Sequence, residues 1–239
     1  MIDRSTSAAL EKIASRERDA IHAYEPGFVP ESSDVARPAR PIAVADPLSV
    51  AAPQGAYFLG IDAAGKVAFS RDGAFAVPGG ELRGPDGRPV LGFALGDRST
   101  LGPLRMDPYD SALGRVSDAR VDADGTFGYT RTSIDPRSGA RRSERVVVGR
   151  VALARFPAGT QPVRVDAIHV ALPHGVKAQI GVPADGTFAA LVPHSRDLGS
   201  VDIVASLEKM KDAFDQYEAQ RAAHHARGDI EKTTLDLVK

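Results

Sequence analysis

The chain has 239 residues, which is enough for one large domain or two small ones with a buried core. Its net charge of −1 gives no reason to expect a general affinity for nucleic acid or for an anionic membrane. It contains no cysteine, which excludes disulfides, thiolate catalysis and cysteine-ligated metal sites, while 23 glycines, 17 prolines and 6% aromatic residues suit a turn-rich β protein.

The N-terminal segment, residues 5–24, is predicted to be a helix capped by Ser5 or Ser7. Its apolar residues recur at helical spacing, but Glu17 interrupts the stripe, so the apolar face is narrow. A lone helix with so little to bury is marginal in water. We expect it to end at residues 25–28, because proline and glycine there disfavour helical continuation. The stripe consists of Leu10, Ile13, Ala14, Ala20, Ile21 and Tyr24.

No segment resembles a secretory signal peptide or a membrane span. Residues 1–20 contain no uninterrupted apolar run, and no stretch approaches the roughly 20 apolar residues needed to cross a bilayer. We therefore expect no membrane insertion. A protein of this kind that leaves the cytoplasm needs an export route without a cleaved signal.

Residues 29–53 hold five prolines and show little periodicity. This composition predicts an extended, largely polyproline-like linker between the N-terminal helix and the next segment.

Residues 54–194 are predicted to form an antiparallel β domain. Short apolar segments alternate with turns, and an Asp-Gly pair between such segments is a strong hairpin signal, since both turn positions need a positive φ. The best single strand is residues 145–156, whose β-branched run contains a glycine that suggests a bulge or bend. Turns are expected at residues 62–65, 72–73, 85–87, 124–125 and 185–186.

Residues 195–239 are predicted to form a long C-terminal helix, with Gly228 as a candidate break. Its apolar residues form a heptad-like stripe, and its other faces are charged. The predicted fold class is thus mainly β with terminal α-helices (α+β), in which helices at residues 1–28 and 195–239 flank the antiparallel β domain and pair in a coiled-coil-like way. The stripe consists of Ile203, Leu207, Met210, Phe214 and Tyr217, with His224 one heptad further.

The stretch Gly60-x-x-x-x-Gly65-Lys66 is close to the phosphate-binding loop of nucleotide hydrolases. That loop needs a Ser or Thr after the lysine to hold magnesium, and a following helix whose N-terminus faces the anion. Val67 stands in the place of the hydroxyl residue, and strand and turn patterns follow it. The stretch is therefore predicted to be a hairpin turn and not a nucleotide site.

Other candidates for chemistry are weak. Asp122 and Asp124 have the spacing that opens calcium loops, but the place of the bidentate glutamate falls on Ser133, which favours a hairpin turn. His224 and His225 are adjacent, so on a helix they point about 100° apart and cannot chelate one metal together. The sequence contains no nucleophile elbow and no recognisable acid/base pair, although folding can bring two carboxylates together. We expect no metal or other cofactor, and an enzyme is the least favoured function.

Residues 131–150 are locally basic. They raise an alternative function, an exported β-rich binding module for a polyanion or a cell-wall glycan, whose binding would weaken steeply with salt. No interleaved aromatic residues accompany the arginines, which favours solvated hairpin positions. The contacts of that alternative would be Arg137, Arg141, Arg142 and Arg145.

A longer pattern extends over residues 55–93. It contains F-S-R-D-G-A-F at residues 69–75 and D-G-R-P-V-L-G at residues 86–92. This pattern resembles the β-domain start of the bacterial flagellar rod and hook protein family, and weaker matches lie in order at residues 20–28 and 198–220. Residues 162–194 have no counterpart. The matching motif residues are Pro26, Gly27, Phe28, Arg71, Asp72, Gly73, Phe75, Asp86 and Gly87.

The resemblance implies a structural subunit of the flagellar basal-body rod, with no chemistry of its own. In that family the two terminal helices pair and pack with those of neighbouring subunits into a tube, and the β domain forms the outer layer. The implied partners are copies of the chain, neighbouring flagellar rod or hook subunits and the flagellar export apparatus. The implied location is the periplasmic axial structure, reached through the flagellar type III export channel.

The thin apolar stripes of the two helices suit this role, because copies packed side by side bury a stripe that stabilises little in a monomer. Such ends are expected to be poorly ordered until assembly. The assembly interface is predicted at Leu10, Ile13, Ile21, Ile203, Leu207, Met210, Phe214 and Tyr217, none of which is catalytic.

Overall fold

The computed structural model describes residues 4–24, 28, 30, 40–62, 64–97, 99–113, 115–135, 139–197, 199 and 201–237. These residues form two compact units, a helical unit from the two ends of the chain and a β unit from its middle, to which Phe28 also belongs. The prediction of a mainly antiparallel β protein with a helix at each end is confirmed.

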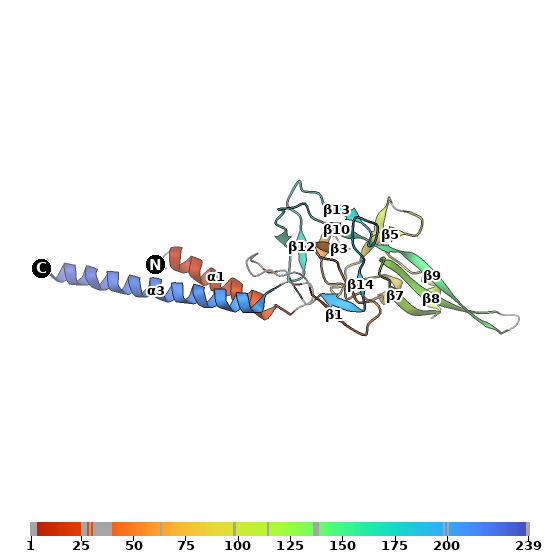
Figure 1. The fold of residues 1–239 in the computed structure, drawn as a ribbon, viewed down its shortest axis with the longest axis horizontal. Helices are drawn as coiled ribbons and strands as arrows, with labels where there is room; N and C mark the ends of the chain where they lie inside the picture. The colour runs from red at the N-terminus through yellow and green to blue at the C-terminus, as the bar shows by residue number, and fades with distance from the viewer. Residues whose placement is uncertain are drawn as a thin grey trace. The chain divides into compact units, whose positions relative to one another are not determined.

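The helical unit consists of α1 (Arg4–Ile21) and α3 (Ile203–Leu237), which pack side by side (Figure 1). Asp202 caps α3, because its Oδ1 accepts hydrogen bonds from the N–H groups of Val204 at 3.0 Å and Ala205 at 3.1 Å. The helix continues through Gly228, so the predicted break there is wrong. A glycine inside a helix costs only about 1 kcal/mol relative to alanine, which the rest of the helix can offset.

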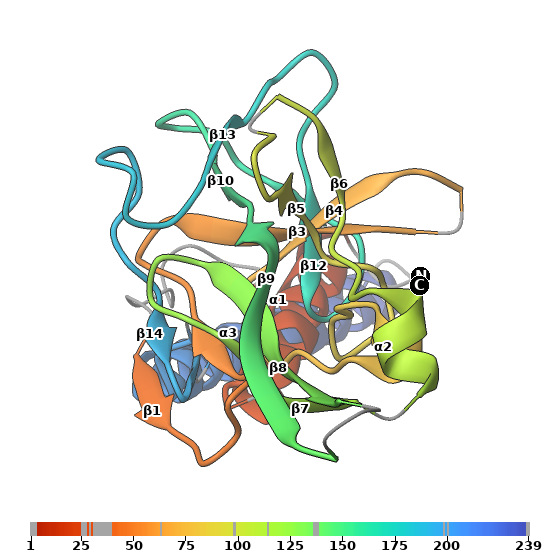
Figure 2. The same ribbon diagram turned by 90° about the vertical axis from the view of Figure 1, so that its right-hand side faces the viewer.

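The β unit is built around two sheets, whose strands Figure 2 shows from one end. Six strands run in the order β11-β12-β4-β3-β10-β13 and five in the order β6-β5-β9-β8-β7, while two further pairs join β1 to β15 and β14 to β2. All of these pairings are antiparallel. The elements are β1 (Pro41–Ala43), β2 (Val50–Ala51), β3 (Ala56–Ile61), β4 (Val67–Ser70), η2 (Pro78–Gly80), β5 (Leu91–Ala94), β6 (Leu101–Pro103), α2 (Pro108–Ala112), β7 (Val116–Val121), β8 (Thr126–Ile134), β9 (Arg141–Val151), β10 (Leu153–Arg155), β11 (Val163–Arg164), β12 (His169–Ala171), β13 (Gln179–Gly181), β14 (Val192–Pro193) and β15 (Ser195–Asp197).

The strand predicted over residues 145–156 is two strands in the structure, because the chain passes at Ala152 from β9 in one sheet to β10 in the other. The predicted bulge is present: Phe127 faces Gly149 and Gly128 faces Val147, which leaves an extra residue on β9. Both sheets contribute to one hydrophobic core, whose buried side chains include Phe58, Leu82, Leu104, Phe127, Tyr129, Val151 and Leu153.

Four of the predicted turns are confirmed, and each has a glycine with positive φ: Gly65 at 78°, Gly87 at 80°, Gly125 at 81° and Gly186 at 90°. The first of them connects β3 to β4 as a hairpin, in which Asp62 Oδ1 accepts the N–H of Lys66 at 2.8 Å. The resemblance to a phosphate-binding loop at this place is therefore only a likeness of residue spacing.

The predicted hairpin turn at Asp72-Gly73 is wrong. The φ of Gly73 is not positive, and the chain after β4 continues through single bridges, of which the first pairs Ala74 with Ser49. Glycine is needed here for a different reason, since an added Cβ would collide with the carbonyl oxygen of Val50 and lie 2.8 Å from the Phe58 ring. The backbone of Gly73 also accepts the N–H of Val50 at 3.0 Å.

We expect Gly73→Ala to lower the free energy of unfolding of the β unit by about 3 kcal/mol, the upper end of the usual range for overpacking a core. Urea denaturation of the full chain measures this loss. Gly102→Ala is the matched control, because a Cβ at Gly102 meets no heavy atom within 4 Å and its φ is not positive. Equal stability of the two variants would contradict the close approach at Gly73.

Two predicted segment boundaries need correction. The predicted linker at residues 29–53 includes β1 and β2, and β2 contributes the buried side chains of Val50 and Ala51 to the β unit; residues 31–39 of that linker lie outside the described residues. The predicted C-terminal helical segment begins with β15, a strand that pairs with β1, and the helix itself begins at Ile203. Proline did not prevent strand formation, because Pro41 is the first residue of an edge strand, where its missing N–H is tolerated.

Candidate functional site: the helical assembly surface

Several of the buried side chains of the paired helices α1 and α3 are small. Ala9 of α1 is 5% exposed, and Ala213 of α3 is also 5% exposed. Ser206 is fully buried, and its Oγ donates a hydrogen bond of 3.1 Å to the carbonyl oxygen of Arg16. Small residues at a helix contact allow a short distance between the two axes.

The covered row of α3 only partly coincides with the predicted stripe. Met210 and Tyr217 are half-buried, and Ile203 is half-buried at the start of the helix. Leu207 and Phe214 lie on the next row and are 46% and 50% exposed. The side chains of α3 that are buried or half-buried along the covered row are Ser206, Met210, Ala213, Tyr217 and Gln220.

Apolar side chains thus remain exposed on both helices after the helices have paired. Val204 is 62% exposed and lies one turn before Leu207, and Phe214 lies two turns beyond Leu207 on the same side. We call Val204, Leu207 and Phe214 the open row. On α1, Leu10 is 42% and Ile21 is 67% exposed, while the remaining predicted interface residue, Ile13, is half-buried.

The C-terminal part of α3 has no helix beside it within the described helical unit. The helix has 35 residues against 18 in α1, and Figure 1 shows it running on past the N-terminal end of α1. Residues 221–230 are exposed except for the half-buried Gly228. A single helix with solvent on all sides is marginal in water, so this part of α3 gains stability from any neighbour that covers it.

The motif residue Arg71 lies at the centre of a buried clamp in the β unit. Its side chain is 6% exposed, and its Nε lies 2.7 Å from Oδ2 of Asp197, whose side chain is 1% exposed. The same guanidinium donates to the carbonyl oxygens of Ala56 at 2.7 Å and Ala52 at 3.3 Å. Arg71 thereby connects the β3–β4 hairpin to β15.

Two neighbouring groups have shifted pKa values. Burial raises the pKa of Asp72. Two groups that donate to its Oδ1 oppose this shift, the Ala74 N–H at 3.0 Å and the Arg196 guanidinium at 3.5 Å. Burial also raises the pKa of Tyr57, whose ring lies 5.8 Å from the Arg71 guanidinium carbon, although the positive charge opposes the shift. These groups are packed and bonded inside the β unit, so the motif contributes to its structure.

The other motif residues have packing or turn positions. Phe75 is buried, and its ring meets that of Phe58 edge-on at 5.0 Å between centroids. Phe28 is 1% exposed and lies beneath the Arg164 guanidinium, 4.5 Å from ring centroid to guanidinium carbon. Gly87 closes the turn that contains Asp86. The motif residues Pro26 and Gly27 lie outside the described residues.

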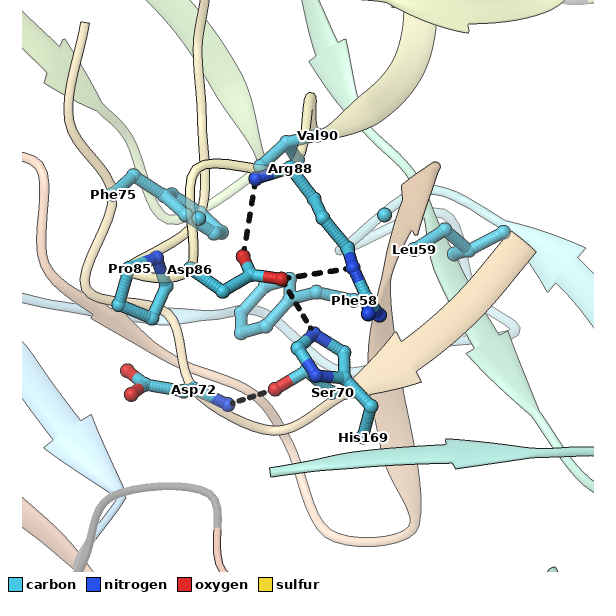
Figure 3. A pocket seen from close by; sticks show the side chains of 12 residues that line it. Phe58, Leu59, Ser70, Asp72, Phe75, Pro85, Asp86, Arg88, Val90 and His169 are labelled. Carbon is cyan, nitrogen blue, oxygen red and sulfur yellow. Dashed lines mark hydrogen bonds and ion pairs between the residues drawn. The ribbon is translucent and has the colours of Figure 1, made fainter. Parts of the chain in front are cut away.

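Asp86 takes part in a polar cluster around the buried His169 (Figure 3). The Nε2 of His169 is 3.3 Å from Asp86 Oδ2, and its Nδ1 is 2.8 Å from Asp166 Oδ1. Both ring nitrogens therefore face carboxylates, and neither is placed to take a proton from the nearby Ser70 hydroxyl. The adjoining cavity of about 20 Å³ has room for about one water molecule. The cluster is not arranged for nucleophilic catalysis.

The Asp166 carboxylate gives the folded β unit a pH dependence. Burial alone would raise the pKa of Asp166, but hydrogen bonds from the His169 ring and from the N–H groups of Ile168 and His169 hold it below its ordinary value. A carboxyl with a lowered pKa stabilises the folded state at neutral pH, and this contribution is lost as the pH falls through the folded pKa. We expect Asp166→Asn to lower the free energy of unfolding near neutral pH more than in acid, as measured by urea denaturation. An equal loss under both conditions would contradict this origin.

The basic segment at residues 131–150 lies on the β8–β9 hairpin. Arg145 is engaged with β7, since its guanidinium donates to a backbone carbonyl there at 3.0 Å. Arg141 and Arg142 are exposed near the end of the hairpin, and Arg137 lies outside the described residues. Of the four arginines that the polyanion alternative requires, Arg141 and Arg142 are thus exposed and unengaged among the described residues, and their side chains leave opposite faces of the strand.

A larger hollow of about 460 Å³ lies beside the end of β5. Asp97, the acidic residue that lines it among the described residues, accepts hydrogen bonds from the N–H and hydroxyl of Ser99, both at 2.7 Å. These hydrogen bonds lower the pKa of Asp97 to about 2. Arg150, its basic residue, donates to the carbonyl oxygen of Asp124 at 2.9 Å. Both charged groups of the hollow are engaged with the protein itself.

Within the described ranges, no group of three or more His, Asp or Glu side chains is placed to hold a metal ion. None of the helices in that part of the chain combines the length and apolar character needed to cross a membrane. No protein-family model matches the sequence, and no curated protein matches it either. The exposed surfaces of α1 and α3 are therefore the basis of the functional proposal.

Proposed function

We propose that the chain is a structural subunit that assembles with copies of itself through its terminal helices, as a component of the bacterial flagellar basal-body rod. The observation that carries self-assembly is the open row, which stays exposed although α1 and α3 are already paired. Burying a Leu or Phe side chain fully is worth about 1.5–3 kcal/mol relative to leaving it in water. A neighbouring copy that covers the open row supplies the share of this free energy that belongs to the still exposed half of each side chain.

In this proposal the two helices form a coiled-coil-like unit with contacts on two adjacent rows. α1 covers the row that contains Ser206 and Ala213, and a neighbouring copy covers the row of Leu207 and Phe214. A helix with apolar contacts on two adjacent rows suits a bundle or tube more than an isolated pair. The uncovered C-terminal part of α3 offers further contact area, and the β unit forms the outer layer.

The flagellar part of the proposal is supported by the resemblance of residues 55–93 to the rod and hook family. Its proposed partners are neighbouring rod or hook subunits and the flagellar export apparatus, and its proposed location is the periplasmic axial structure. The burial of Arg71, Asp72 and Phe75 supports a role of that motif in shaping the β unit and not in chemistry. We propose no enzymatic activity, no cofactor and no nucleic-acid partner.

Single-cysteine variants test the contact directly, because the chain has no cysteine of its own. Copies with Leu10→Cys mixed with copies with Leu207→Cys are expected to form cross-linked dimers with a short bismaleimide, and dimers only, because each copy has one thiol. Lys66→Cys, at the exposed tip of the β3–β4 hairpin, is the control and should give much less product. Equal yields at all three positions would show that the helices are not the preferred contact.

The rod assignment has a separate test in the source bacterium. Deletion of the gene is expected to abolish flagella, and the protein should be recovered in purified basal bodies. Normal flagella in the deletion strain would contradict the rod assignment and would leave self-assembly through the helices as an independent result.

A further inference from the structure

The outer edge of β9 is open over most of its length. β9 pairs with β8 from Arg141 to Arg150, but with β5 only from Gly149 to Val151. No described residue pairs with residues 141–147 on the side away from β8. Figure 1 shows the β8–β9 hairpin extending beyond the other strands of the β unit. An exposed strand edge of this kind is a template for pairing with another chain.

The backbone groups of this edge point outward at alternate residues. Thr132 donates its N–H to the Arg115 carbonyl oxygen, on the side of β8 away from β9, at 2.9 Å, and it faces Ser143 in register. In an antiparallel ladder, opposite residues that exchange no hydrogen bonds turn these groups away from each other. Ser143 therefore presents its N–H and C=O to the open edge. Arg141 and Arg145 do the same because strands have a period of two residues.

The unengaged charges along this edge are positive. Glu144 is paired with Arg131 on β8, and Arg145 donates to a carbonyl oxygen on β7. Arg141 and Arg142 are exposed and form no ion pair within the described part of the chain. They are consecutive, so their side chains leave opposite faces of the hairpin. A strand added at this edge would have a guanidinium above it and another below it.

We propose that the open edge of β9 binds an extended, acidic segment of a partner protein as an added β-strand. Main-chain hydrogen bonds at Arg141, Ser143 and Arg145 supply affinity, and the free guanidinium groups of Arg141 and Arg142 select carboxylates. The terminal helices take no part in this contact. The inference therefore goes beyond the proposed function and does not depend on it.

A second copy of the chain is a poorer occupant of this edge. The β9 edge of a second copy has no free carboxylate for Arg141 and Arg142, because Glu144, the one acidic residue among residues 141–147, is paired with Arg131. The opposite edge of the same sheet, β7, is interrupted by an irregularity between Ser117 and Arg120, where Asp118 has a φ of 51°. Such a bulge disturbs the row of backbone groups that a partner strand needs.

The probe is a fluorescein-labelled octapeptide of alternating Glu and Thr, titrated with the full chain and followed by fluorescence anisotropy. Ser143→Pro removes the outward N–H without removing a backbone bond to β8, and it should weaken binding by about tenfold or more. Ser143→Ala keeps the N–H and should bind within about twofold of the natural chain. Both variants lose the 3.3 Å hydroxyl contact of Ser143 with Thr132, so that loss cancels in their comparison. Arg141→Gln with Arg142→Gln should weaken binding and reduce its salt dependence, and a Lys/Thr octapeptide should not bind.

Each remaining outcome overturns the proposal. Equal binding by Ser143→Pro and Ser143→Ala would mean contact through side-chain charge alone, as with a polyanion. Absence of binding to the natural chain would mean that the edge is not a site for an acidic strand. Self-association that requires the Ser143 N–H would assign the edge to a second copy.

Amide hydrogen exchange on the natural chain is a second measurement that needs no variant. Slowed exchange at Ser143 and Arg145 in the presence of the peptide is expected, and unchanged exchange at both residues overturns the proposal.

Discussion

Asp197→Ala is expected to lower the free energy of unfolding of the β unit by about 3–5 kcal/mol. The reason is the cation that it leaves behind: Arg71 Nε lies 2.7 Å from Asp197 Oδ2, and both side chains are buried. The carbonyl oxygens of Ala52 and Ala56 still accept its N–H groups, but they do not neutralise its charge. Urea denaturation of the full chain measures the loss.

Two further variants distinguish the effect of breaking this buried ion pair from the effect of breaking an exposed one. Arg120→Ala breaks pairs that are about 40–55% exposed, and it should cost at most about 1 kcal/mol. Arg71→Met combined with Asp197→Leu should regain most of the loss, because replacing both members of a buried pair by apolar residues is often neutral or stabilising. A loss below about 1 kcal/mol in Asp197→Ala would contradict the structural role of the clamp.

Leu207→Gln combined with Phe214→Gln is expected to weaken self-association by roughly tenfold to a hundredfold. Moving such a side chain from water to full burial is worth about 1.5–3 kcal/mol, and each of the two is already about half buried, so each loses about half of that. About 1.4 kcal/mol corresponds to a factor of ten in an equilibrium constant. Both side chains are about half exposed in the single chain, so the fold should tolerate the changes. Sedimentation velocity at matched concentrations measures the association.

Glu208→Gln combined with Asp212→Gln is the matched control on the same helix. Both residues are exposed and polar, and neither belongs to the open row. This control should associate like the natural chain or slightly better, because it removes like charges. Equal weakening by the two double variants would show that association does not depend on the apolar side chains.

The local parts of the fold could be predicted because single residues determine them. A glycine after an aspartate or near it in a short loop permits a positive φ, and the turns at Gly65, Gly87 and Gly125 follow that rule. The strand pattern around these turns gave the antiparallel character of the β unit. Gly73 follows the same sequence rule but has another reason to be glycine, which is the approach of Val50 from 23 positions earlier in the chain.

The parts that could not be predicted depend on contacts between distant positions. Arg71 and Asp197 are 126 residues apart, and nothing in either local sequence shows that they pair in the core. The same limit applies to β1 and β15, which are short and gain their strand conformation from each other.

The candidate site shows where apolar periodicity is informative and where it is not. The periodicity predicted two helices with thin apolar stripes, and it identified Leu207 and Phe214 as candidate interface residues. It did not predict that α1 would cover the row of Ser206 and Ala213, because small residues carry little weight in an apolar pattern. Close approach of two helices favours those small residues, and it leaves the larger side chains on the adjacent row exposed.

The most direct test of self-assembly through the helices is the mass of the natural full chain, followed by sedimentation over a wide range of concentrations. The proposal predicts that the mass rises with concentration toward large species and falls back to that of one chain on dilution. It also predicts little sensitivity to salt, because the contact is apolar. A mass of 25.2 kDa at every concentration would contradict it.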